Sequence, residues 1–129
     1  MSQHGMKVVE AAWEAWERGG LDAFAEYWAD DIEWHAIGGQ WCGKDAGRAY
    51  LQAWIDLFDE FKPEPIELID VGDERVITLV RYGGRERRSG MEVPREYFAV
   101  INEVRNDKIV SGYEYATREE AVKAAGMQE

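Results

Sequence analysis

The second half of the chain contains four strand-like segments joined by very short connections. The segments cover residues 66–71, 76–82, 91–104 and 108–116, and their residues alternate between apolar and polar or are rich in β-branched types. Turn-forming pairs separate the segments, namely Gly72-Asp73, Gly83-Gly84 and Asn106-Asp107. Because such short connections join antiparallel neighbours, this half predicts a single antiparallel sheet.

Apolar residues near the start of the chain recur at helical spacing. A stripe at intervals of three and four predicts one helix, and it consists of Val9, Ala12, Trp13 and Trp16. The glycine pair at 19–20 ends that helix, and a second, shorter helix is expected from Leu21 until it stops at Asp30 and Asp31. A short strand over 32–37 and a glycine-rich loop over 38–43 follow.

Two further helices complete the predicted elements. Asp45 is expected to cap the third helix, whose broad apolar face consists of Tyr50, Leu51, Trp54, Phe58 and Phe61. Thr117 with Glu120 forms a capping box for a short last helix. Helices followed by long antiparallel strands predict an α+β domain, a cone-shaped α+β barrel whose curved antiparallel sheet is covered on its concave face by the N-terminal helices.

Length and composition limit the kinds of partner and the cellular compartment that we expect for this protein. A chain of 129 residues predicts a single domain spanning 1–129, and 26 acidic against 15 basic residues give a net charge of -11 that would repel nucleic acid and anionic membranes. No apolar run approaches the roughly twenty residues needed to cross a bilayer. The single cysteine cannot form an internal disulfide, and no secretion signal is evident. We therefore expect a cytoplasmic protein with neither a nucleic-acid nor a membrane partner.

Three charged residues stand near the middle of strand-like segments, each in step with apolar neighbours two residues away: Arg81, Glu96 and Glu114. Burying an unpaired charge disfavours folding, so charges of both signs at inward positions predict a polar patch inside a pocket. If the turn between the central strands is centred near Arg88 and Ser89, Arg81 and Glu96 lie opposite one another and can form an ion pair. The alternatives are an ion-pair network that only closes the sheet, or a register in which these side chains face water.

Large side chains at helical and strand positions are candidates for the pocket wall. The predicted wall consists of Trp16, Trp28, Trp34, Trp41, Tyr50, Trp54, Phe58, Leu79 and Phe98. For most of them, ordinary core packing is the alternative. Tyr97, Tyr113 and Tyr115 alternate away from the predicted pocket, and this second face predicts a homodimer that packs sheet against sheet, or contact with another protein.

Other chemistries find little support in the sequence. His35 alternates with Trp34 and is expected to point outward, and His4 lies near the start of the chain. Two distant histidines and one cysteine do not form a metal-ligand set, so neither a metal nor a cofactor is expected. Cys42 has no residues around it that would activate a thiol, and a packed small residue is the expected role.

Four stretches of the chain carry a resemblance to a known family: VVEAAWEAWERGGLDAFAEYWADDIEW, GKDAGRAYLQAWIDLF, RRSGMEVPREYFAVINEVRNDKIVSGYEY and TREEAVKAAG. Over nearly its entire length the chain resembles the SnoaL-like branch of the nuclear transport factor 2-like superfamily. The resemblance implies the cone-shaped fold with an internal pocket. It does not imply one activity, because the superfamily includes isomerases, cyclases, epoxide hydrolases, dehydratases and proteins without catalysis.

Comparison with two enzyme types of the superfamily separates the candidate mechanisms. The resemblance to ketosteroid isomerase places Ala36 where that enzyme has its aspartate base and Ala12 where it has a tyrosine, which disfavours a steroid isomerase mechanism. Limonene-type epoxide hydrolases use an aspartate, an arginine and a second aspartate. Glu96, Arg81 and Glu114 supply the same group types, although Pro94 lies where that family has a charged residue two before the carboxylate.

The leading interpretation is a pocket protein that binds a small, largely apolar molecule and performs cofactor-free acid/base chemistry of the epoxide hydrolase, cyclase or isomerase type. Glu96 would be the general base or acid, and Arg81 would hold a carboxylate ionised or bind an oxyanion. Glu114 would complete the proton relay. The alternative is a non-catalytic ligand-binding or dimerisation module of the same fold.

Overall fold

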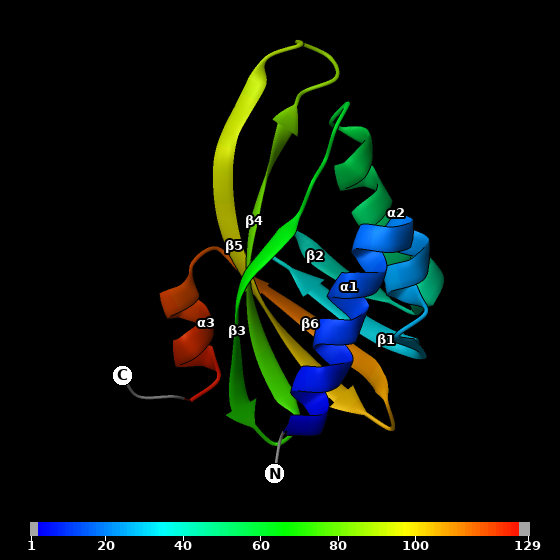
Figure 1. Cartoon of the computed structure of the whole chain (residues 1–129), viewed down its shortest axis with the longest axis vertical. Coiled ribbons are helices and arrows are strands. Elements are labelled where there is room, and N and C mark those ends of the chain that lie inside the picture. Colours follow the sequence, from blue (N-terminus) through cyan, green and yellow to red (C-terminus); the bar gives the residue numbers. More distant parts are fainter. Residues whose placement is uncertain (1–2, 127–129) are drawn as a thin grey trace.

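Six strands form one curved, unclosed sheet in the order β2-β1-β6-β5-β4-β3 (Figure 1). The computed structural model describes residues 3–126, apart from the side chains of residues 3, 94 and 95, so the ends of the predicted 1–129 domain lie outside the described residues. The strands are β1 (Trp28–Ala36), β2 (Gly39–Cys42), β3 (Glu64–Gly72), β4 (Arg75–Arg85), β5 (Glu92–Arg105) and β6 (Lys108–Tyr115). The helices are α1 (Gln3–Ala25), α2 (Lys44–Asp56) and α3 (Arg118–Ala124).

The α+β architecture is confirmed, with one difference in the sheet. Strands β3 to β6 pair antiparallel in chain order, as their short connections require. Strand β1 pairs parallel with β6, so the sheet is mixed rather than wholly antiparallel. No hairpin constrains that pair, because β1 and β6 lie far apart in the sequence. None of the helices within residues 3–126 is long and apolar enough to cross a membrane.

Two of the three predicted turns form, the first of them one residue later than predicted. Asp73 and Glu74 connect β3 to β4, and Asn106 and Asp107 connect β5 to β6. All four residues have positive φ, between 52° and 66°, which is the backbone twist that a tight hairpin needs. The third predicted turn, at Gly83-Gly84, is wrong, because β4 continues through both glycines to Arg85.

The first third of the chain departs from the prediction in three places. The break predicted at the glycine pair is confirmed, because Gly20 has non-helical angles (φ 70°, ψ -151°) inside α1. The helical segment after it ends at Ala25, so the prediction that Trp28 belongs to this segment is wrong and Trp28 lies in β1. The predicted loop over 38–43 contains strand β2, which pairs with β1. Because glycine has no side chain, this segment shows no alternation of apolar and polar residues, and the sequence pattern does not predict the strand. Gly43, not Asp45, is the N-cap of α2, and that helix ends before Phe58.

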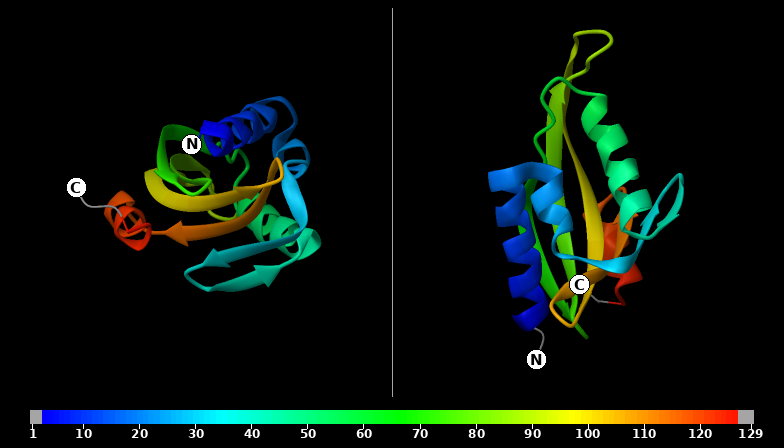
Figure 2. Two further views of the ribbon diagram at one scale, coloured as in Figure 1. Left: turned by 90° about the horizontal axis from the view of Figure 1, so that it is seen from below. Right: turned by 90° about the vertical axis from the view of Figure 1, so that its right-hand side faces the viewer.

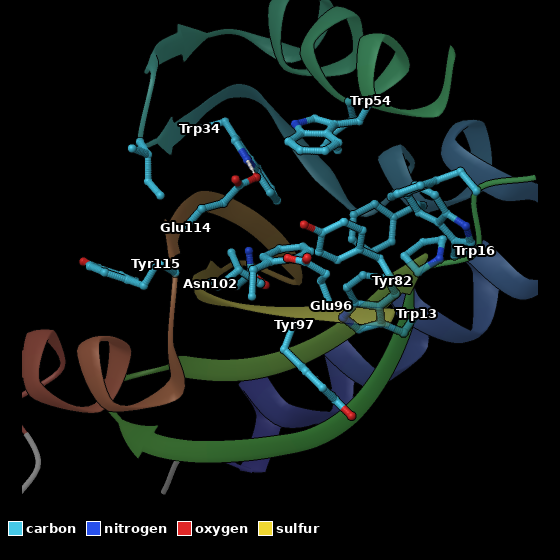
Figure 3. Close-up of a pocket in the computed structure, with 18 residues that line it drawn as sticks. Trp13, Trp16, Trp34, Trp54, Tyr82, Glu96, Tyr97, Asn102, Glu114 and Tyr115 are labelled. Atoms are coloured by element: carbon cyan, nitrogen blue, oxygen red, sulfur yellow. Dashed lines mark hydrogen bonds between the residues drawn. The ribbon is translucent and has the colours of Figure 1, made fainter. Parts of the chain in front are cut away.

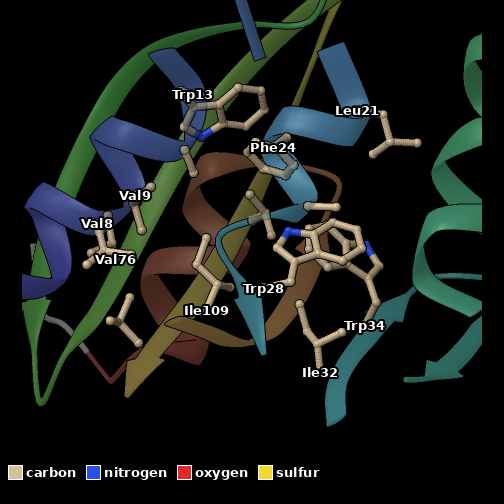
Figure 4. Packing of buried hydrophobic residues seen from close by; sticks show 14 of the residues in the cluster. Val8, Val9, Trp13, Leu21, Phe24, Trp28, Ile32, Trp34, Val76 and Ile109 are labelled. Carbon is tan, nitrogen blue, oxygen red and sulfur yellow. The ribbon is translucent and has the colours of Figure 1, made fainter. Parts of the chain in front are cut away.

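The helices lie on both faces of the sheet. Figure 2 shows α1 and α2 over one face and α3 against the other. On the first face, Val76, Val80 and Val100 of the sheet join a core with α1 and β1, shown in Figure 4. On the second face, Ile77 and Ile101 belong to a smaller core with α3. Thr117 caps α3 as predicted, since its hydroxyl accepts a hydrogen bond from the amide of Glu120 at 3.1 Å.

A bulge in the β4–β5 pair determines which charges face the helices. Near the hairpin tip Arg85 lies opposite Glu92, which is the register expected for a turn centred near residues 88 and 89. The register shifts between Tyr82 and Gly84, and below that point Tyr82 lies opposite Glu96. A shift of one residue turns side chains to the other face of the sheet. The charges predicted to be opposite one another therefore lie on different faces.

Candidate functional site

A cavity of about 300 Å³ lies between α1, α2 and the sheet face that they cover (Figure 3). Its described lining consists of Trp13, Trp16, Phe24, Trp34, Ile37, Leu51, Trp54, Phe61, Pro63, Tyr82, Glu96, Tyr97, Phe98, Val100, Asn102, Glu114, Tyr115 and Ala116. Buried members such as Trp13 and Val100 form its floor, whereas Ile37 and Glu96 are exposed and mark its mouth. Most of this surface is aromatic or aliphatic, so the cavity suits an apolar molecule.

The Glu114 carboxylate is the polar centre of the cavity wall. The indole Nε1 of Trp34 donates a hydrogen bond to Oε2 at 2.7 Å, and the phenol of Tyr50 donates one to Oε1 at 2.9 Å. Trp54 Nε1 in turn donates to the Tyr50 hydroxyl oxygen at 3.1 Å. Because an indole N–H can only donate, the chain from Trp54 through Tyr50 has one direction and ends on the carboxylate.

The β1–β6 register and the packing around Trp34 direct its indole N–H toward Glu114. Trp34 of β1 pairs with Gly112 of β6, two residues before Glu114. A Cβ atom at position 112 would lie 2.5 Å from the nearest atom of the Trp34 ring, so only glycine lets the indole rest on the β6 backbone. Trp28 packs against Trp34 at a centroid distance of 5.6 Å. The ring therefore has little freedom to turn its N–H elsewhere.

Helix α2 supplies the second donor. Tyr50 and Trp54 lie one turn apart on this helix, which places their polar atoms on the same face. The Trp41 ring of β2 stacks on Tyr50 at a centroid distance of 4.0 Å. The short β2 strand, absent from the sequence prediction, thus holds the phenol against Glu114.

Burial raises the pKa values of two groups in this cluster, Glu114 and Tyr50. Desolvation raises the pKa of Glu114, and the hydrogen bonds from Trp34 and Tyr50 oppose that shift only in part. Burial and the neighbouring Glu114 charge raise the pKa of Tyr50 far above its ordinary range, so this phenol remains a donor. The site therefore contains one carboxyl group with a strengthened hold on its proton and two fixed donors facing it.

A second carboxylate lies nearer the mouth. Glu96 of β5 lies opposite Tyr82 of β4, and both line the cavity. Burial raises the pKa of Tyr82 first, and the charges of Glu96 and Glu114 raise it further. The charges of both carboxylates therefore influence the pKa of the same phenol, that of Tyr82. Figure 3 shows Glu96 beside Tyr82, whereas Tyr97 extends away from the group.

The prediction that Arg81 joins the two carboxylates in the pocket is wrong. Arg81 lies opposite Tyr97 on the other face of the sheet, and its Nε donates to Glu64 Oε1 at 3.0 Å. It is not among the described lining residues. The physical cause is the bulge, which rotates the face of β5 relative to the hairpin tip. Glu96 and Glu114 remain on the cavity side.

The predicted wall residues separate into two groups. The structure places Trp16, Trp34, Trp54 and Phe98 on the cavity lining. It places the others elsewhere: Trp28 in the core, Trp41 and Tyr50 behind the lining, Phe58 buried beside the hairpin, and Leu79 against the core under α3. Leu79 shares the parity of Arg81, so the same register error misplaced it.

Two of the tyrosines predicted to alternate away from the pocket also contribute to its lining. Tyr97 and Tyr115 border the cavity, although Figure 3 shows both rings directed away from the two carboxylates. Tyr113 is absent from the described lining, and its ring is partly exposed. The prediction of an outward face therefore applies fully to Tyr113 and only in part to the other two.

Sequence reasoning missed several wall residues. Trp13 and Phe24 follow the apolar stripe of α1, and that spacing could have found them. Tyr82 was hidden by the register error. Phe61 reaches the cavity because the segment after α2 packs on the β4–β5 hairpin, where the amide of Asp59 donates to the Arg85 carbonyl at 2.8 Å.

Metal-binding residues do not gather in the described part of the chain. Within residues 3–126 no three His, Cys, Asp or Glu side chains lie close enough together to hold a metal ion. His35 accompanies Glu33 on β1 and stacks on Tyr113 at a centroid distance of 4.2 Å, away from the cavity lining. Cys42 is an exposed free cysteine at the end of β2, so the expectation that it is a packed small residue is wrong.

Solved structures show that the fold recurs among proteins with little sequence identity. Bal32a from a soil-derived mobile gene cassette is 20% identical, with a TM-score of 0.75 over 88% of this chain and 89% of that chain. A putative polyketide cyclase from Xanthomonas campestris pv. campestris is 20% identical, with a TM-score of 0.69 over 96% and 98%. A protein with a ketosteroid isomerase-like fold from Catenulispora acidiphila, in complex with trimethylamine, is 19% identical, with a TM-score of 0.70 over 93% of each chain.

Comparison of the sequence with protein-family models identifies the family to which the chain belongs. No curated protein matches the chain. A family model described as the SnoaL-like domain matches residues 9–112, which include α2, most of α1 and most of the sheet. The match ends two residues before Glu114 and spans most of the elements around the cavity, and we conclude that this chain belongs to the SnoaL-like domain family.

Proposed function

We propose that this protein binds a small, largely apolar organic molecule in the cavity and carries out cofactor-free acid/base chemistry on it. The observation that carries the proposal is the Glu114 carboxyl group, held on an aromatic wall by Trp34 and Tyr50. A group of this kind can donate a proton to a developing oxyanion, and its ionised form can remove a proton from carbon or water. Proteins of this fold include a putative polyketide cyclase and one solved with trimethylamine.

Glu114 and Glu96 have different environments, which suits them to different roles. Glu114 is part-buried and has a raised pKa, whereas Glu96 is exposed at the mouth. Two carboxyl groups held in different surroundings suit the separate roles of an acid/base pair. We assign proton transfer to Glu114 and a second, assisting role to Glu96. Arg81 has no part in this proposal, because it lies on the other face.

The experiment is a substrate panel of epoxides, enones and polyketide-like ketones, tested with wild type and Glu114→Gln. The glutamine has a similar shape and cannot exchange a proton near neutral pH. Turnover should fall by about 100-fold or more, with ligand affinity kept within a few fold. Glu103→Gln is the matched control, since Glu103 is paired with Arg105 outside the cavity. Equal turnover in wild type and Glu114→Gln would refute the catalytic role.

A sheet-face homodimer is the second candidate function, as a binding or assembly module. It is favoured by the partly exposed ring of Tyr113 on the face opposite the cavity, where His35 stacks on it, and by the exposed ring of Tyr97. The lone exposed Cys42 fits a reducing cytoplasm. Light scattering of wild type and Tyr113→Glu tests the dimer. A wild-type dimer that the substitution dissociates supports it, and a wild-type monomer refutes it.

A further inference from the structure

The charges that line the cavity have one sign. Among the described lining residues, Glu96 and Glu114 are the carboxylic acids, and no lysine or arginine accompanies them. The chain as a whole carries a net charge of -11. A cleft lined by carboxylates in an acidic protein attracts cations and repels anions on approach. The cavity therefore selects against acidic ligands.

Glu114 has neutral hydrogen-bond partners only. Within residues 3–126 it accepts hydrogen bonds from Trp34 and Tyr50, and no lysine, arginine or histidine forms an ion pair with it. A carboxylate removed from water without a counter-ion is disfavoured, which is the reason its proton is held more strongly. A positively charged ligand would supply the counter-ion that Glu114 does not have among the described residues.

The cavity wall is largely aromatic, and its rings are inclined to one another. Ring planes make 75° between Trp54 and Tyr82 and 64° between Tyr82 and Phe98, and the angle is 46° between Phe61 and Tyr82. Rings in this arrangement enclose a space from several sides and do not form one flat stack. Aromatic enclosures of this kind suit alkylated ammonium groups, whose charge is spread over apolar methyl or methylene groups.

We propose that the ligand of this cavity is an organic cation, a tertiary or quaternary ammonium with apolar substituents, whose charge lies against Glu114 between the rings of Trp34 and Trp54. The proposal rests on the small-molecule pocket proposed above and names its ligand class. A primary ammonium is a poorer fit, because it needs three hydrogen-bond acceptors and most of the lining offers none. A neutral ligand of the same shape would leave Glu114 without a counter-ion.

Binding of such a cation depends on the ionised form of Glu114. The groups that face this carboxylate are Trp34 from β1, Tyr50 and Trp54 from α2, Tyr82 from β4 and Glu96 from β5. The pKa values of Tyr50 and Tyr82 are raised above the ordinary tyrosine value, so neither phenol ionises over the range in which carboxyl groups titrate. Affinity for the cation should therefore rise with pH as the Glu114 carboxyl group ionises, whereas affinity for a neutral isostere should stay constant.

The test compares benzyltrimethylammonium with its uncharged isostere neopentylbenzene, measured by tryptophan fluorescence at about 0.15 M salt from about pH 5 to 8. Wild type should bind the cation at least about tenfold more tightly at the upper end of this range, and the preference should shrink toward the lower end. Glu114→Gln should lose the preference while binding neopentylbenzene within about twofold of wild type. Glu103→Gln should retain the wild-type preference.

The outcomes separate this inference from the proposed pocket. Binding of neopentylbenzene as tightly as the cation would overturn the ligand class and leave the pocket intact. Failure of both probes to bind would overturn both proposals. A folded Glu114→Gln variant that keeps the full preference would overturn the assignment to Glu114. If that variant does not fold, the wild-type pH series decides, since a flat ratio of the two affinities contradicts the proposal.

Discussion

Trp34 rests directly on the backbone of Gly112, across the parallel pairing of β1 with β6. The glycine has no side chain to hold the indole away, and the indole N–H consequently reaches the Glu114 carboxylate two residues further along β6. A single missing Cβ thus determines the direction of a hydrogen bond in the cavity. This pairing links the sheet register to the chemistry of the site.

Gly112→Ala is expected to displace the Trp34 ring, because the new Cβ would lie 2.5 Å from it. Overpacking of this kind should cost about 1–3 kcal/mol of unfolding free energy, measured by urea denaturation. Near-ultraviolet circular dichroism should also change. Gly38→Ala is the matched control, since a Cβ added there would meet no other atom within 4 Å. Equal stability of the two variants would contradict the tight packing.

Tyr50→Phe removes one of the two hydrogen bonds to Glu114. Because that hydrogen bond lowers the carboxyl pKa, its loss should raise the pKa of Glu114 further. The variant should also lose about 1 kcal/mol of stability. Carbon-13 NMR titration of the glutamate carboxyl groups measures the shift, with Tyr113→Phe on the opposite face as control. A Glu114 pKa that falls or stays constant in Tyr50→Phe would refute the assigned geometry.

Glu114 should make the folded protein less stable as the pH rises. Its pKa is raised in the folded state, so the folded protein binds the proton more strongly than the unfolded chain does. The resulting stabilisation is fully present below the unfolded carboxyl pKa, about pH 4, and is lost as the pH rises through the folded-state value. Glu114→Gln removes this contribution.

Urea denaturation at a series of pH values from about 4 to 8 measures the contribution of Glu114 to the free energy of unfolding. The stability of wild type minus that of Glu114→Gln should decrease steadily with pH. The slope is informative even if glutamine changes the absolute stability, because the amide does not titrate. A difference that increases with pH would show that the carboxylate is stabilised in the fold and not desolvated.

Arg81→Met should leave ligand binding unchanged. The guanidinium is paired with Glu64 on the face away from the cavity, and Arg81 is not among the described lining residues. Ligand affinity, measured by tryptophan fluorescence with any ligand of the panel, should stay within about twofold of wild type. A loss of affinity as large as that in Glu114→Gln would mean that Arg81 reaches the ligand.

The sequence is sufficient to predict most of the sheet and one part of the site. Strand alternation and the paired turn residues at 72–73 and 106–107 identify β3 to β6, since these signals are local. Alternation also assigns Glu114 to the cavity side, because its neighbour Tyr113 faces the other way. Local patterns suffice where the ladder is regular.

The errors come from features that depend on tertiary contacts. The bulge between Tyr82 and Gly84 leaves two signals in the sequence, the glycine pair at 83–84 in β4 and Pro94 in β5. Its effect on Arg81 requires the register of the folded pair. The hydrogen bond from Tyr50 to Glu114 joins residues 64 positions apart. No periodicity specifies such a contact, since the packing of α2 on β1 and β2 creates it.

The most direct test of the central claim is the titration of the Glu114 carboxyl carbon by NMR, assigned with Glu114→Gln, in the free protein and in the presence of an active ligand of the panel. We predict a pKa above the ordinary glutamate value in the free protein and a resonance that shifts when the ligand binds. A Glu114 pKa at or below the ordinary value, with a resonance unaffected by ligand, would contradict the claim that this carboxyl group forms the site.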